Sequence, residues 1–141
     1  MTFDDFKILH SELIMHMQCI ENDLKIIYAA MKPGNFDKNY DELEKSNLGQ
    51  ITRVLKRLDY SDGYPDLLPE DYRTIDRIRE TRNYWCHQCY LDFIYLTNCG
   101  LQEEKLREIA ERLSEDTVPI RSLREKLQNL RMVKLKEYHR I

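Results

Sequence analysis

The stretch RNYWCH, residues 82–87, lies inside a helical pattern of apolar residues that extends from about Glu70 to Asn98. On an α-helix each residue advances by about 100°, so Asn83 and His87, four residues apart, should stand one turn above each other on one face. The long side chain of Arg82 can lean toward the same face. The spacing therefore predicts that these three side chains serve one pocket.

The residue types at these positions form a coherent set for attacking an RNA phosphodiester. An arginine carries a permanent charge on a planar fork that binds phosphate, an asparagine can orient a hydroxyl, and a histidine can transfer a proton near neutral pH. We predict catalytic roles for Arg82, Asn83 and His87. We predict substrate contacts from three residues around them: Arg79, Tyr84 and Tyr90.

Arg82 also falls close to the packing face of the predicted motif helix. The apolar spacing predicts a buried stripe of Tyr72, Ile75, Ile78, Trp85, Cys89, Phe93 and Leu96. An arginine beside such a stripe needs a solvated cleft or an ionic partner to offset its desolvation. The alternative to a catalytic role is thus an ion pair of Arg82 with Glu80, with Asp76 or with a neighbouring helix.

The motif resembles the signature of the HEPN family, in which an arginine, usually followed by a polar residue such as asparagine, precedes a histidine by a few positions. Here it reads Arg82, Asn83 and then His87. The resemblance implies a bundle of helices and a homodimer in which the motifs of both chains face one cleft. It also implies metal-independent cleavage of RNA that leaves a 2′,3′-cyclic phosphate, in a toxin or defence protein. The alternative within this fold is a catalytically silent dimeric module for interaction or nucleotide binding.

Some HEPN toxins have a nucleotidyltransferase antitoxin as partner and carry a modifiable tyrosine two residues after the histidine. In this chain that position is Cys89, and Tyr90 comes one residue later. The departure argues against the modification mechanism and favours a packing role for Tyr90. The partners that the resemblance implies are a second copy, RNA and an antitoxin of this type, and no metal or other cofactor is predicted.

Composition predicts one soluble all-α domain over residues 1–141, because 33% of the residues are charged and Gly and Pro number only four each. The net charge of −3 argues against a globally basic nucleic-acid binder, so RNA contact would come from a local cluster such as Arg77, Arg79 and Arg82. No signal peptide or membrane-spanning run is evident, so we expect a cytoplasmic protein with no membrane contact.

Four cysteines occur in helical patterns, and we expect all of them to be reduced. Cys86 and Cys89 have a C-x-x-C spacing, which also occurs in zinc and redox sites. A structural zinc site normally has a second ligand pair, and the redox motif needs a strand-to-helix turn. A mid-helix position offers neither, so Cys89 is assigned to the core.

The remaining pattern predicts an up-and-down bundle of four to five helices. Helices are expected over about 3–31, from Ser46 or Asn47 through Leu58, from Pro69 to Asn98, over 102–115 and over 120–138. Residues 32–40 are expected to form a loop, Asn98-Cys99-Gly100 to cap the motif helix, and Pro119 to break or kink the last segment.

Overall fold

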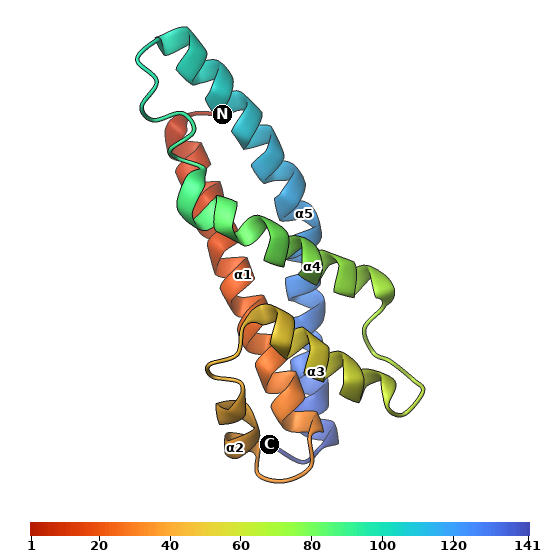
Figure 1. The fold of residues 1–141 in the computed structure, drawn as a ribbon. Coiled ribbons are helices and arrows are strands. Elements are labelled where there is room, and N and C mark those ends of the chain that lie inside the picture. Colours follow the sequence, from red (N-terminus) through yellow and green to blue (C-terminus); the bar gives the residue numbers. More distant parts are fainter.

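A computed structural model describes residues 1–141 as five α-helices and one π-helical turn, with no strand (Figure 1). The predicted all-α bundle is therefore confirmed. In chain order the elements are α1 (Phe3–Met31), α2 (Phe36–Glu42), α3 (Leu48–Tyr60), α4 (Pro69–Asn83), the π-helical turn η1 (Tyr84–Gln88) and α5 (Cys99–Glu137).

The two long helices, α1 and α5, lie side by side and run in the same direction (Figure 1). Ion pairs between them advance together along both helices: Arg121 lies 3.9 Å from Glu12, and Arg131 lies 2.6 Å from Asp23. After α1 the chain runs back to the start of α5 through α3, α4 and η1. These connecting elements cross one face of the α1–α5 pair, with α3 and α4 running in opposite directions.

One continuous apolar core joins all the long helices. Its largest fully buried side chains come from α1, α3, α4, η1 and α5, and from the α3–α4 connection: Phe6, Leu13, Ile20, Leu24, Ile27, Ile51, Leu55, Leu67, Ile75, Ile78, Trp85 and Leu113. Burial on this scale is the main source of stability in a bundle of this size. Trp85, inside the motif, is a central member of the core.

The first helix has the predicted bounds because its end signals are local. The Thr2 side chain accepts a hydrogen bond from the Asp5 N–H at 3.1 Å, and the Asp5 carboxylate accepts from the Thr2 N–H at 3.2 Å. This reciprocal capping satisfies two N–H groups that have no helical partner. Pro69 begins α4, as predicted, because its missing N–H costs nothing in a first turn.

The prediction of a loop over residues 32–40 was wrong for its second half, where α2 forms. Asn35 caps this short helix, its side chain accepting from the Lys38 N–H at 3.0 Å. The buried Asn39 then donates to the carbonyls of Ala29 (3.2 Å) and Lys32 (2.9 Å) at the end of α1. Because these bonds reach back to another helix, the local sequence pattern did not reveal them.

The prediction of a single helix from about residue 70 to Asn98 was also wrong. The α-helix ends at Asn83, η1 follows, and only turns and coil lie between it and α5. Leu96, predicted to be buried, is 39% exposed because the stripe stops at Phe93. Asn98 does not close the motif helix, since its side chain accepts from the Leu101 N–H at 3.1 Å and so begins α5.

The predicted break at Pro119 does not occur, because α5 continues through it for 39 residues in all. Proline removes one N–H and so leaves the carbonyl of Glu115 without its helical partner. Both Pro119 and Glu115 are exposed, so water can bond to that carbonyl. Meanwhile Ile120 and Leu123 continue the buried stripe against α1, which offsets the cost.

Candidate functional site at the π-helical turn

The motif lies where α4 changes into η1. Arg82 and Asn83 are the last residues of α4, and the Cys89 N–H closes η1 by donating to the Tyr84 carbonyl at 2.9 Å. This bond spans five residues, so each residue advances by less than in an α-helix, and His87 lies less than a full turn beyond Asn83. Such π-helical turns are rare in proteins and are frequent at functional sites.

A buried tryptophan anchors this turn to α5. Trp85 is completely buried, and its Nε1–H donates to Asp116 Oδ2 at 2.9 Å. The other oxygen of that carboxylate accepts from Arg77 Nη2 at 3.3 Å. The buried Asp116 carboxylate thus has one hydrogen-bond partner in η1 and one in α4. Its bond to Trp85 fixes the position of η1 against α5.

A histidine of α1 holds the same turn from the other side. His10 Nε2 lies 2.6 Å from the Trp85 carbonyl oxygen, and the Tyr90 hydroxyl lies 3.2 Å from His10 Nδ1. With Nε2 donating to the carbonyl, Nδ1 is left to accept from the tyrosine. The contact supplies the Trp85 carbonyl with a side-chain partner where the regular ladder of helical bonds is interrupted.

Arg82 lies away from the packing face, contrary to the prediction, because Thr81 takes the inward position. Its side chain is 45% exposed, and Nη2 lies 3.1 Å from Glu21 Oε2 on α1. The pair borders a small cleft of about 50 Å³ that Gln18 and Cys86 also line. Of the ionic partners considered from sequence, the one observed is the neighbouring helix.

Asn83 and His87 are exposed, and neither side chain makes a hydrogen bond or ion pair within the chain. Both are therefore free to contact a ligand. The structure brings Arg82, Asn83 and His87 onto one short exposed segment, with only the arginine partly neutralised.

Of the three predicted substrate contacts, Arg79 is exposed and the tyrosines are half-buried. The Arg79 guanidinium lies 3.9 Å from Asp76 and packs over Gly49, where an added Cβ would stand 2.9 Å from Nη1. Gly49 thus allows α3 to approach this side chain closely. A side chain at this position would require Arg79 to move.

The two tyrosines face intramolecular partners. Tyr84 donates to Asp92 at 2.8 Å, and the Arg112 guanidinium carbon lies 4.1 Å from its ring centroid. Tyr90 packs edge-on against the rings of Phe6 and His10. Burial raises the pKa of both phenols, and the bond to Asp92 raises the pKa of Tyr84 further. Tyr90 therefore has the packing role that its sequence position suggested.

The cysteines of the C-x-x-C pair have different surroundings. Cys86 is exposed, whereas Cys89 is buried and its Sγ donates weakly to the Trp85 carbonyl at 3.5 Å. Burial raises the pKa of the Cys89 thiol to about 11. All four cysteines are free thiols, and Cys89 belongs to the core as predicted.

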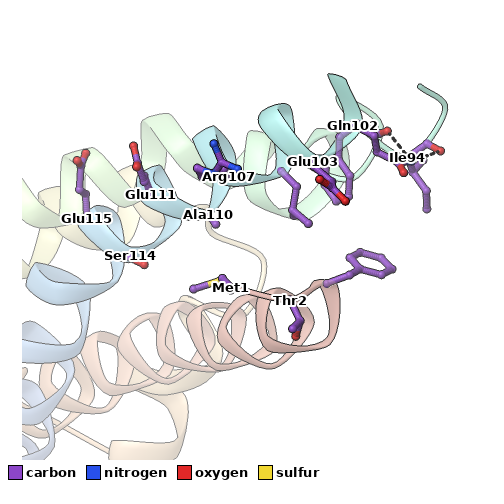
Figure 2. Close-up of a pocket in the computed structure, with 13 residues that line it drawn as sticks. Met1, Thr2, Ile94, Gln102, Glu103, Arg107, Ala110, Glu111, Ser114 and Glu115 are labelled. Carbon is purple, nitrogen blue, oxygen red and sulfur yellow. Dashed lines mark hydrogen bonds between the residues drawn. The ribbon is translucent and has the colours of Figure 1, made fainter. Parts of the chain in front are cut away.

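A larger cleft lies elsewhere, between the start of α1 and the first half of α5, and has a volume of about 730 Å³. Figure 2 shows Met1 and Thr2 on one side and Glu103, Arg107 and Glu111 on the α5 side. The charges on this face of α5 alternate in sign, a pattern that normally marks a solvated surface and does not by itself indicate a site. The separation of α1 from α5 that opens the cleft has no local sequence signal.

Comparison with protein-family models, with curated proteins and with solved structures finds no match. The resemblance to the HEPN family therefore stands on the motif alone. No helix combines the length and the apolar character of a membrane span.

Proposed function

We propose that the protein is a metal-independent endoribonuclease of the HEPN type, acting in the cytoplasm as a toxin or defence protein. The observation that carries this proposal is the exposure of an R-N-x-x-x-H motif that extends from the end of α4 into the π-helical turn, with the polar groups of Asn83 and His87 unpaired. A buried tryptophan and a histidine from α1 hold this turn on both sides. Such support provides the rigid placement that catalytic groups require.

Each side chain has a distinct role in this mechanism. His87 acts at one of the two reacting oxygens: it takes the proton of the attacking ribose 2′-hydroxyl as a general base, or it gives a proton to the departing oxygen as a general acid. Arg82 binds the phosphate, where its planar fork can make two parallel hydrogen bonds to the developing charge. Asn83 orients His87 or the ribose. The product of this attack is a 2′,3′-cyclic phosphate and a free 5′-hydroxyl.

One copy of the motif offers a single histidine, whereas the reaction needs proton transfer at both the attacking and the leaving oxygen. A two-fold pair would supply two histidines and two arginines to one groove. Exposed apolar side chains follow the motif directly, with Leu91 49%, Ile94 46% and Tyr95 79% exposed. A second copy packed through this segment would cover them while facing the two motifs toward each other.

The nuclease proposal is tested by incubating labelled RNA with the protein in the presence of a chelator. Replacing His87 by alanine should lower the cleavage rate by about 100-fold or more, the usual contribution of a general acid or base. The matched control is His139→Asn, because His139 is exposed at the chain end with a φ of 56°, which asparagine tolerates. Equal cleavage by wild type and H87A would exclude His87 from the chemistry.

The dimer is tested by light scattering, since a pair would have twice the 17.1 kDa mass of the chain. Leu91→Glu should shift the protein toward monomer by placing a charge in the interface. Val133→Glu, an equally polar change at a 55% exposed site in the last third of α5, should not. A wild-type protein that is monomeric at high micromolar concentration would defeat both the dimer and the composite site.

A second candidate is a catalytically silent module for interaction or nucleotide binding, and the Glu21–Arg82 ion pair favours it. A guanidinium already paired at 3.1 Å must exchange this carboxylate for a phosphate before it can act. Glu21→Gln separates the two candidates. In the nuclease the change frees Arg82 and should raise RNA affinity and cleavage, whereas in the silent module neither protein cleaves RNA.

An antitoxin partner of the nucleotidyltransferase type is part of the toxin version of this proposal. Co-expression with the product of a neighbouring gene of that class, followed by purification through a tag on one chain, tests it. Because Cys89 stands where such toxins have their modifiable tyrosine, any restraint on this protein should act through binding and not through modification at that position.

A further inference from the structure

A polar cleft of about 240 Å³ lies between α1 and α5. Its walls carry two guanidinium groups, one carboxylate and three side-chain amides, with one thiol beside them. The lining residues are Gln18, Cys19, Asn22, Asp23, Arg124, Gln128 and Arg131. With two positive charges and one negative charge, the cleft has a net charge of +1.

The excess charge belongs to Arg124, which has no carboxylate within ion-pairing distance. Its Nη1 lies 3.2 Å from Nδ1 of His16, a buried side chain on α1. Burial lowers the pKa of His16, and the nearby charges of Arg124 and Arg121 lower it further. The imidazole therefore stays neutral and accepts from the guanidinium, so it orients Arg124 without cancelling its charge.

Arg131 is held differently, by the buried carboxylate of Asp23 at 2.6 Å. That pair fixes the guanidinium at the wall of the cleft while leaving other N–H donors of its fork available. The two arginines thus stand seven residues apart on α5, two turns along the same face. Each is placed by a buried group of α1.

The amides supply further donors. The side-chain oxygen Oδ1 of Asn22 accepts a hydrogen bond from the Tyr40 hydroxyl at 2.7 Å, which directs the Asn22 NH₂ group away from Tyr40. Gln18 and Gln128 are exposed and make no hydrogen bond within the chain. Two arginine forks surrounded by free amide donors form a donor set suited to a phosphate group.

The cleft is also adjacent to the motif. Gln18 lines both this cleft and the small one bordered by Arg82 and Glu21, so the two clefts lie on neighbouring faces of α1. Because an α-helix is roughly 10 Å across, a short stretch of RNA is enough to extend from one cleft to the other. A single strand that leaves Arg82 and passes over Gln18 would arrive at Arg124.

We propose that the cleft between α1 and α5 binds a backbone phosphate of the RNA strand that is cleaved at Arg82. The identity of the ligand as RNA rests on the proposed function, whereas the assignment of a phosphate rests on the cleft itself. Arg124 provides the principal charge, and Arg131 with the amides of Gln18, Asn22 and Gln128 provides further donors.

The test measures binding separately from cleavage. Fluorescence anisotropy of a short labelled oligouridine is recorded with the H87A protein between about 50 and 200 mM salt. Adding Arg124→Gln should weaken binding by roughly five- to tenfold and reduce the slope of log affinity against log salt by about one unit or slightly less. The matched control is Arg107→Gln, which removes the same charge from an exposed site roughly 25 Å away along α5.

A second variant keeps the test valid if Arg124→Gln folds poorly. Gln128→Glu places a negative charge in the cleft at an exposed position and should also weaken binding. Asn129→Glu adds the same charge to the next exposed residue, outside the cleft, and should weaken it less. Equal effects of each variant and its control would overturn the proposal.

The outcomes also separate this inference from the nuclease proposal. Oligouridine binding that depends on Arg124, in a wild-type protein that does not cleave RNA, would support the phosphate site and defeat the nuclease. If cleavage requires His87 but the Arg124→Gln variant binds RNA normally, the nuclease proposal is supported and the phosphate site is defeated. ADP that binds through Arg124 more tightly than oligouridine would overturn the assignment to an RNA strand.

Discussion

Replacing Trp85 by phenylalanine should destabilise the protein by about 3 kcal/mol. The indole Nε1–H is a hydrogen-bond donor to Asp116 at 2.9 Å, and both residues are buried. Loss of a hydrogen bond to a charged group costs about 1.5 to 3 kcal/mol, and the smaller ring leaves a cavity that adds about 1 kcal/mol more. Arg77 still contacts the carboxylate at 3.3 Å, which keeps the total from rising further.

The assay is urea unfolding followed by circular dichroism, with thermal unfolding as a second probe. For a chain of this size a change of 3 kcal/mol should lower the melting temperature by about 10 °C. Tyr64→Phe, at an 83% exposed site, should change stability by less than about 0.5 kcal/mol. If W85F were as stable as Y64F, the buried bond would contribute nothing and the anchoring of η1 to α5 would be refuted.

Three further predictions concern titration, thiol reactivity and the proline in α5. Because the folded pKa of His16 lies below its unfolded value, the unfolded chain binds more protons as the pH falls below about 6.5. Stability should therefore decline from pH 7 to about pH 5, and His16→Asn should flatten that decline in urea titrations. Ellman's reagent at about pH 8 should label the exposed Cys86 rapidly and Cys89, with its pKa of about 11, only on unfolding. Pro119→Ala should stabilise α5 by about 1 to 3 kcal/mol, and a lower melting temperature would contradict our account of that exposed site.

The parts of the fold that were predicted correctly depend on contacts within a few residues. The end of α1 follows from the proline and glycine after it, and the start of α4 follows from Pro69. Amphipathic spacing predicts that α3 turns Leu48, Ile51, Val54, Leu55 and Leu58 inward; Leu48, Ile51 and Leu55 are buried, and Val54 and Leu58 are partly buried against the core. These signals need no knowledge of the partner helix.

The errors occur where distant residues determine the backbone. Trp85 contacts Asp116, 31 positions later, and His10, 75 positions earlier. The continuation of α5 through Pro119 likewise depends on packing against α1. Local propensity penalises a mid-helix proline, but it contains no information about the apolar face that the other residues bury.

The sequence indicated which residues form the candidate site, but it did not indicate which residues contact them. The exposed positions of Asn83 and His87 agree with a motif that meets a ligand, whereas the partner of Arg82 could not be named, because Glu21 lies 61 positions earlier on α1. The phosphate cleft was missed for the same reason. Its two arginines belong to α5, and the His16 and Asp23 side chains that place them belong to α1.

The buried residues at the π-helical turn and on either side of it are four positions apart. Thr81, Trp85 and Cys89 are all buried, although on an α-helix a spacing of four residues drifts by about 40° per step, or about 80° over two steps. The wider turn of η1 advances each residue by less than 100° and so reduces this drift between Trp85 and Cys89. Arg82 lies before η1 on the solvent side of α4, one residue beyond the buried Thr81, and the turn then exposes His87. A variant that relieves the spacing, such as deletion of Cys86, should therefore convert η1 into a regular α-helical turn and reduce RNA cleavage even where the core remains folded.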